Sequence, residues 1–288
     1  MKVEDEFTLS NYKTIAALNP AHEIYLVQHI STKSIYVKKE LHVFDRDVLT
    51  RLQKHPVKGI PQIIELIPAD NNTLILIEEY IAGTDLEHLL QEKHHLSESE
   101  TTQIVLQLCD ILEVLHRLQP PIIHRDIKPG NLILSPEGHL FLIDFNAARM
   151  DKVHRAEDTV LLGTKGYAAP EQYGFGSSDV TTDIYAIGML INTLLTGKVS
   201  REDIAGGKYR PIIKKCLQID RNKRYASVTE LKSAITGKFV TPQWMRYLPP
   251  GFRQANPLHM VLACFLYLVI YAGLTGVFDT AVGENHNP

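Results

Sequence analysis

The segment IIHRDIKPGNLIL, residues 122–134, is the feature that most restricts what this chain can fold into. It begins and ends with apolar runs of the length of short strands, as a loop between two strands would. Within eight positions it carries five polar or charged side chains: His124, Arg125, Asp126, Lys128 and Asn131. Such a density of charge inside a hydrophobic frame is hard to explain by folding alone, so the segment indicates a functional loop.

A second apolar run ends in an acid. The stretch FLIDFNAAR, residues 141–149, places Asp144 where a strand should bury its side chains. A buried carboxylate is costly unless a cation meets it. The sequence therefore predicts that a cation lies beside Asp144.

Residues 1–82 are expected to form a small lobe built on a sheet. The stretch STKSIYVKKEL, residues 31–41, alternates as a strand does, which sends Lys39 inward as a buried cation. A slip of one residue in register would send Lys38 inward instead. Residues 45–56 follow with the apolar spacing of a helix.

Residues 83–237 are expected to form a larger, mainly helical lobe. Ser97 and Glu100 have the spacing of a capping box and precede an amphipathic run. Further helices are predicted around residues 183–195 and 227–235. The predicted fold class is therefore α+β, with a small antiparallel-sheet lobe and a larger helical lobe.

The loop at 122–134 resembles the catalytic loop of the protein kinase family, which reads H-R-D-x-K-P-x-N in serine/threonine members. The resemblance continues in order over residues 12–237. DFN at 144–146 is similar to the metal-binding D-F-G, GTKGYAAPE at 163–171 to the end of an activation segment, and DIYAIG to the helix after it. Arg224 falls where the family places an arginine that pairs with the glutamate of A-P-E, here Glu171.

The resemblance implies a two-lobed kinase fold and a role for each polar residue of the loop. Asp126 would orient the substrate hydroxyl and accept its proton, and Lys128 would lie near the transferred phosphate, which favours a serine or threonine acceptor. Asn131 and Asp144 would hold Mg²⁺ through oxygen atoms. The cation that meets Asp144 would then be a metal ion bridging to ATP, and Lys39 would contact the α- and β-phosphates.

The resemblance leaves the surroundings of the nucleotide open. The family pairs its strand lysine with a helix glutamate, and Asp45 is nearest to that role here, with Asp47 as the other option and Glu40 as a third. Backbone groups of Glu79 and Ile81 would flank the adenine. Glu78 stands where the family generally has an apolar residue, and its carboxylate needs a partner that the sequence does not name.

Two departures from the family pattern affect the nucleotide site. No glycine occurs before Gly59, so the usual glycine-rich loop over the phosphates is missing, and Asn11, Asn19 or His22 would have to supply contacts instead. Asn146 replaces the glycine of D-F-G. Asparagine tolerates positive φ better than most residues other than glycine, so the turn can still form. The principal hypothesis is an active serine/threonine kinase of divergent, bacterial type. The alternative is a pseudokinase, a nucleotide-binding or scaffolding module.

The C-terminal region has a different character. Residues 258–278 form an apolar run without Asp, Glu, Lys or Arg, which predicts a transmembrane helix. Basic residues occur only before this run, so residues 1–257 would lie in the cytoplasm of a single-pass protein of the cell membrane, with a linker at 238–257 and a short external tail at 279–288. Confinement to the membrane would favour transient self-association and phosphorylation of one copy by another, with Thr159 as the first acceptor to test.

Charge and cysteine content limit the partners. A net charge of −3 argues against binding nucleic acid. The three cysteines are widely spaced and suggest neither a zinc site nor a disulfide framework, which suits a reducing compartment. The expected partners are therefore ATP with Mg²⁺, a protein substrate and, through the C-terminal helix, a membrane.

Overall fold

The computed structural model describes residues 3–69, 72–151, 164–174, 177–237, 258 and 260–271. The chain divides into two units, Met1–Gly237 and Lys238–Pro288. The predicted acceptor Thr159, the predicted linker at 238–257 and the predicted tail at 279–288 lie outside the described residues.

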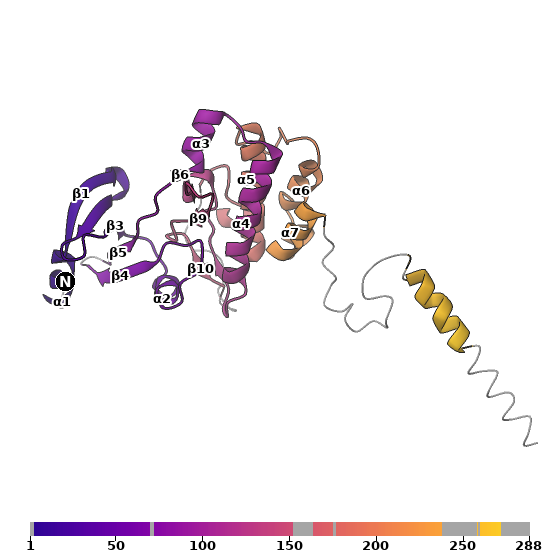
Figure 1. The fold of residues 1–288 in the computed structure, drawn as a ribbon, viewed down its shortest axis with the longest axis horizontal. Coiled ribbons are helices and arrows are strands. Elements are labelled where there is room, and N and C mark those ends of the chain that lie inside the picture. Colours follow the sequence, from indigo (N-terminus) through magenta and orange to yellow (C-terminus); the bar gives the residue numbers. More distant parts are fainter. Residues whose placement is uncertain are drawn as a thin grey trace, which may run out of the picture. The chain divides into compact units, whose positions relative to one another are not determined.

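The first part of the larger unit is a five-stranded antiparallel sheet with strand order β1-β2-β3-β5-β4 (Figure 1). Its elements follow in the order α1 (Val3–Ser10), β1 (Tyr12–Asn19), β2 (Ile24–His29), β3 (Ile35–Leu41), α2 (Arg46–Lys54), β4 (Ile63–Pro68) and β5 (Leu74–Glu79). A 3₁₀ turn, Pro20–His22, joins β1 to β2. Helix α2 is the one long connection within the sheet, since it carries the chain from β3 to the edge strand β4.

The predicted alternation of β3 is confirmed. Val37, Lys39 and Leu41 are buried, and only 5% of the surface of Lys39 is exposed. Lys38 lies on the other face, where its ammonium pairs with Glu40 at 2.8 Å. The register is therefore the one that sends Lys39 inward, as the apolar residues on either side of it predict.

The second part of the unit is mainly helical and lies to the right of the sheet in Figure 1. Its helices are α3 (Leu86–Lys93), α4 (Glu98–His116), α5 (Val180–Thr196), α6 (Tyr209–Cys216) and α7 (Val228–Thr236). Its short strands are β6 (Thr84–Asp85), β7 (Ile122–Ile123), β8 (Leu132–Leu134), β9 (Leu140–Leu142) and β10 (Arg149–Met150), and 3₁₀ turns occupy Pro129–Asn131, Pro170–Tyr173 and Arg221–Lys223. Strands β6, β8 and β9 form one small sheet, and β7 with β10 forms another.

Helix α4 begins as the sequence predicts. The Ser97 hydroxyl accepts the Glu100 N–H at 3.2 Å, and the Glu100 carboxylate accepts the Ser97 N–H at 2.9 Å. Each contact satisfies a donor that the first turn of a helix leaves without a partner. Helix α5 follows at the centre of the lobe, where its residues from Thr182 to Leu194 are buried.

One continuous hydrophobic core joins the two lobes. It includes Leu41 of β3, Val48 and Leu49 of α2, and a large set of residues from α4 and α5. A smaller cluster of Val27, Ile67, Ile75 and Ile77 lies within the small-lobe sheet. Because helix α2 packs into the shared core, it links the sheet to the large lobe mainly through apolar contacts.

The structure does not support the predicted transmembrane anchor. Within the predicted span, a helix is described at residues 258 and 260–271, and residues 259 and 272–278 lie outside the described part of the chain. Among the residues that are described, no helix combines the length and the apolar character needed to cross a bilayer. The predicted membrane partner and single-pass location therefore have no structural support.

Candidate active site

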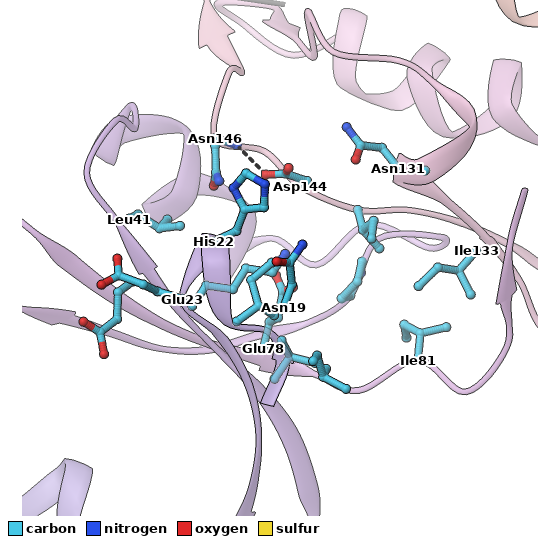
Figure 2. A pocket seen from close by; sticks show the side chains of 18 of the residues that line it. Asn19, His22, Glu23, Leu41, Glu78, Ile81, Asn131, Ile133, Asp144 and Asn146 are labelled. Atoms are coloured by element: carbon cyan, nitrogen blue, oxygen red, sulfur yellow. Dashed lines mark hydrogen bonds and ion pairs between the residues drawn. The ribbon is translucent and has the colours of Figure 1, made fainter. Parts of the chain in front are cut away.

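A cavity of about 630 Å³ lies between the two lobes (Figure 2). The small lobe contributes residues of β2, β3 and β5, and the large lobe contributes the loop at 128–133 and the turn at 143–146. Among the residues that the structure describes, its lining includes the acidic residues Glu23, Glu40, Glu78, Glu79, Glu87 and Asp144 and the lysines Lys39 and Lys128, although the Glu40 carboxylate pairs with Lys38 on the other face of β3. Acidic residues therefore outnumber lysines in the described part of the lining.

Asp126 is held at both carboxylate oxygens. Thr164 donates to Oδ1 from its backbone N–H at 3.0 Å and from its hydroxyl at 2.8 Å. Asn131 Nδ2 donates to Oδ2 at 2.9 Å, and Lys128 Nζ lies 3.0 Å from the same oxygen. Lys128 Nζ also donates to the Thr164 hydroxyl at 2.7 Å. Lys128 and Thr164 therefore fix the orientation of Asp126 from two directions.

The surroundings of Asp126 keep it ionised. Burial by itself raises the pKa of this carboxyl, but the charge of Lys128 and the hydrogen bonds from Thr164 and Lys128 outweigh burial, so the pKa of Asp126 is lowered. At neutral pH Asp126 is thus a carboxylate, the form that orients a hydroxyl and accepts its proton.

A buried acid of helix α5 fixes the backbone on which Asp126 stands. Asp183 Oδ2 accepts the N–H of His124 at 3.0 Å and His116 Nε2 at 2.8 Å, and Oδ1 accepts the N–H of Arg125 at 2.9 Å. Burial raises the pKa of Asp183, but the hydrogen bond and charge of His116 and those of its other partners outweigh it, so the pKa is lowered. Asp183 is not among the site residues predicted from the sequence, although an acid inside an apolar helix is a signal for a buried hydrogen-bonding centre.

Asn131 and Asp144 are brought together by the backbone. The Ile143 N–H donates to the Asn131 carbonyl at 3.0 Å, which places the two segments side by side, and both residues line the cavity. The Asn131 Nδ2 is committed to Asp126, so its amide oxygen is the atom left for another cation, and Figure 2 shows that oxygen on the side of the residue nearer Asp144. One amide and one carboxylate oxygen form a donor pair that suits a hard divalent cation.

The turn after Asp144 differs from the expectation in one detail. Asp144 itself adopts positive φ, at 64°, whereas Asn146 is not among the described residues with positive φ. The Asn146 N–H donates to Asp144 Oδ1 at 3.3 Å (Figure 2). Aspartate tolerates the left-handed region, so the asparagine that replaces glycine here is not required to adopt it.

Lys39 pairs with Glu78, not with an acid of the helix. Lys39 Nζ lies 2.7 Å from Glu78 Oε1, and both side chains are buried. Asp45 instead caps helix α2, where its Oδ1 accepts the N–H of Asp47 at 3.0 Å and of Val48 at 3.4 Å. The predicted pairing of Lys39 with Asp45 is therefore corrected, and Glu78 gains the partner that the sequence did not name.

The acids around Lys39 keep it charged. Burial lowers the pKa of Lys39, but the nearby carboxylates of Glu78 and Asp144, with the hydrogen bond to Glu78, outweigh burial and raise the pKa above its usual value. Lys39 is therefore an ammonium group inside the cavity.

The rim of the cavity contains the remaining predicted residues. Glu79 and Ile81 both line it. The Glu79 backbone N–H donates to the Gln62 carbonyl at 2.9 Å, and the Glu79 carboxylate accepts the Gln62 N–H at 3.2 Å. The Glu79 N–H is thus used within the small lobe.

The connection between β1 and β2 replaces a glycine-rich loop with the 3₁₀ turn Pro20–His22, followed by Glu23 at φ 55°. Asn19 and His22 both line the cavity (Figure 2). Asn11 does not line it, since its amide nitrogen donates to the Phe7 carbonyl at 3.1 Å within the N-terminal turn. Two of the three side chains considered from the sequence therefore reach the cavity.

The predicted pairing of Arg224 with Glu171 is confirmed. The guanidinium forms two parallel contacts with the carboxylate, Nη1 to Oε1 at 2.7 Å and Nη2 to Oε2 at 2.9 Å. Both side chains are buried, and the Thr182 hydroxyl donates to the same carboxylate at 2.9 Å. This pair ties the segment after Thr164 to the end of the large lobe.

Comparison with known proteins gives one family. The family described as protein kinase domain matches residues 18–234. Serine/threonine-protein kinase D of Synechocystis sp. is 31% identical over 231 residues, which cover 71% of this chain and 43% of that protein. Serine/threonine-protein kinase B of the same organism is 29% identical over 222 residues, covering 68% and 38%. Serine/threonine-protein kinase Sgk1 of Homo sapiens is 31% identical over 189 residues, covering 64% and 42%.

The chain spans less than half the length of these relatives. The matched residues, however, contain every polar group of the cavity described above, from Asn19 to Asn146. The match also covers well over half of the chain. The chain therefore belongs to the protein kinase family.

Proposed function

We propose that the protein is a serine/threonine protein kinase that transfers the γ-phosphate of ATP to hydroxyl groups of proteins, including other copies of itself. The observation that carries the proposal is the ionised Asp126, whose two oxygens are fixed by Thr164, Asn131 and Lys128. Asn131 and Lys128 themselves line the cavity. Phosphoryl transfer requires mainly positioning and neutralisation of charge, which this arrangement can provide.

Each polar group of the large lobe has a role in the proposal. Asp126 orients the acceptor hydroxyl and takes its proton. Lys128 lies within contact of Asp126 and Thr164, so its ammonium can also stabilise negative charge on the transferred group. Asn131 and Asp144 would hold Mg²⁺ through their oxygens, and that ion would neutralise phosphate charge when bound.

The small lobe would hold the rest of the nucleotide. Lys39 carries the positive charge that can meet the α- and β-phosphates. Glu79 and Ile81 at the rim would flank the adenine. Asn19 and His22 would take the place of glycine backbone groups above the phosphates.

The charge of the cavity supports a metal-bound nucleotide. Among the described residues of the lining, acidic side chains outnumber the two lysines even without Glu40, so a polyphosphate without a cation would be repelled. A divalent cation held by Asn131 and Asp144 would reduce this repulsion. The oxygen donors of Asn131 and Asp144 and the charge of the cavity therefore both favour a nucleotide that binds together with a divalent cation.

A second cavity of about 650 Å³ adjoins the first and suits the acceptor segment. Lys128, Gly130 and Glu87 line both cavities, and Thr164 lines the second. A Cβ atom at Gly130 would lie 2.7 Å from Glu87 Oε2, so glycine lets this carboxylate approach the catalytic loop. An acidic group at this border favours acceptor segments that carry a basic residue.

The test uses the full chain with ATP, Mg²⁺ and a generic basic protein. We expect phosphate on serine or threonine, and Asp126→Asn to lower the rate at least ~100-fold, since general base catalysis and orientation contribute about 10²–10⁴-fold. Asn retains an oxygen that can accept from Thr164, so the loop should keep its shape. Asp110→Asn, which removes an exposed carboxylate of α4, is the matched control.

Two results would overturn the proposal. Equal transfer by the wild type and Asp126→Asn would show that any activity comes from elsewhere. Binding of ATP without transfer to any protein would establish the pseudokinase alternative, which the glycine-free β1–β2 turn favours.

A further inference from the structure

The buried lysine of the small lobe receives its acidic partner from the sheet. Strands β3 and β5 are antiparallel neighbours in which Val37 stands opposite Glu78, and Lys39 stands opposite Leu76. Lys39 and Glu78 are therefore diagonal neighbours on one face of the sheet, a separation that two long side chains can bridge. They do so with an Nζ to Oε1 distance of 2.7 Å.

Helix α2 offers no comparable group to Lys39. The side chains that it buries are Val48, Leu49 and Leu52, which are apolar. Its single acid, Asp47, is exposed, and Asp45 uses its carboxylate to cap the helix. The helix thus contributes packing to the small lobe, while the charge that meets Lys39 comes from β5.

Burial makes this pair dependent on both partners. Only 5% of Lys39 and 8% of Glu78 is exposed, so either charge alone would lack both water and a partner. The pair also lies in the lining of the cavity, and the charge of Asp144 adds to the field at Lys39. The position of the Lys39 ammonium is therefore set by a contact between two adjacent strands.

We propose that Glu78 is the positioning residue for Lys39, and that it replaces the helix acid so that the lysine is held toward the nucleotide phosphates whatever the position of α2. This inference rests on the proposed function of the cavity. Its physical basis is separate, because hydrogen bonds between β3 and β5 fix the two residues relative to each other. A displacement of α2 would leave the pair intact.

The first measurement follows the reactivity of Lys39 in the full chain and needs no kinase activity. An acylating ester labels only the neutral form of an amine, and mass spectrometry reports the rate at each lysine. Glu78→Gln removes the carboxylate that favours the charged amine, so Lys39 should be labelled faster. Each unit by which the pKa of Lys39 falls gives about a tenfold rise in rate at a pH well below that pKa. Asp47→Asn, which removes the one acid of α2, should leave the rate unchanged.

The second measurement is a double-mutant cycle on phosphotransfer. Glu78→Gln should lower kcat/KM for ATP at least ~10-fold, and Glu78→Asp should recover part of this loss because it keeps the charge on a shorter stem. In a Lys39→Met background, Glu78→Gln should cause no further loss, since a residue that acts only through Lys39 has nothing left to position. The double variant removes both buried charges, so it also serves if Glu78→Gln alone unfolds.

The outcomes separate the inference from the proposed function. Unchanged labelling of Lys39 in Glu78→Gln, or faster labelling in Asp47→Asn, overturns the inference. An additional loss in the Lys39→Met background also overturns it, because Glu78 would then act independently. If the wild type transfers no phosphate, the proposed function fails, and the labelling rates still decide whether Glu78 or the helix controls Lys39.

Discussion

Replacement of Asp183 by asparagine tests whether one buried carboxylate holds the catalytic loop. In the wild type, Asp183 Oδ1 accepts a hydrogen bond from the backbone N–H of Arg125. Oδ2 accepts hydrogen bonds from the backbone N–H of His124 and from His116 Nε2. Asparagine keeps the shape but turns one of these oxygens into a donor. The NH₂ group of the asparagine then faces at least one N–H group that the Asp183 carboxylate accepts in the wild type, and that hydrogen bond is lost.

The magnitude follows from what is lost. A hydrogen bond to a charged acceptor is worth about 1.5–3 kcal/mol, and a buried N–H left without an acceptor costs about 1–3 kcal/mol more. The expected loss is therefore about 2.5–6 kcal/mol of the free energy of unfolding. For a domain of this size the corresponding fall in Tm is on the order of 10 °C or more.

Two assays report on the same substitution. Thermal unfolding of the full chain, followed by circular dichroism, gives the change in Tm. Phosphotransfer, measured well below the lower Tm, should show a fall in kcat of at least ~10-fold with a KM for ATP within about twofold, because Asp126 is displaced while the nucleotide contacts remain. Glu113, whose carboxylate contacts Thr229 and Arg117 at the surface side of α4, provides the control Glu113→Gln.

One result would refute this reasoning. If Asp183→Asn melts within about 2 °C of the wild type, its three hydrogen bonds are not worth the free energy assigned to them. A normal kcat in a destabilised variant would show instead that the loop keeps its shape without Asp183.

Four further predictions concern the same lobe and the cavity. Arg224→Met should lower the free energy of unfolding by about 3–5 kcal/mol in urea titrations, because it leaves Glu171 buried without its partner. Burial raises the pKa of Glu171, but Arg224 and the other donors outweigh burial and hold this pKa below its usual value. The stabilisation is therefore present at neutral pH and is lost as the pH falls through the lowered pKa. The free energies of unfolding of the wild type and of Glu171→Gln, measured against pH, should show different dependences in the acid range. His22→Ala should raise KM for ATP several-fold with little change in kcat in steady-state assays, and an unchanged KM would exclude contact with the phosphates. Asn131→Ala should raise the Mg²⁺ concentration needed for half-maximal nucleotide binding about tenfold, and excess chelator should abolish binding by the wild type, both followed by calorimetry.

Local patterns predicted the residues whose partners are close in sequence or whose strand alternates clearly. The inward orientation of Lys39 follows from Val37 and Leu41, which flank it on the same face. The capping box of α4 follows from a spacing of three residues. In each case the decisive interaction is set by the periodicity of one element, which the sequence contains in full.

The partner of Lys39 could not be found in this way. Its identity depends on how β5 pairs with β3, because a shift of two residues that set Glu78 opposite Ile35 would move it away from Lys39 on the same face. The register results from the packing of distant segments and has no local signal. Asp45 had a local signal for its real role, since aspartate is a preferred residue immediately before a helix.

The charge balance of the cavity connects its two departures from the family pattern. Backbone N–H groups of a glycine-rich loop and an ammonium group would both attract phosphate, but this chain has a glycine-free turn in one place and a lysine already paired with Glu78 in the other. The glycine-free turn reduces the attraction that the small lobe can exert on a polyphosphate, whereas Lys39 stays paired with one acid, as the family's strand lysine is. The acidic residues of the described lining reduce the attraction further. The compensating positive charge would then come from a divalent cation held by Asn131 and Asp144. We therefore expect nucleotide affinity in this chain to depend more on the metal site of the large lobe than on contacts from the sheet.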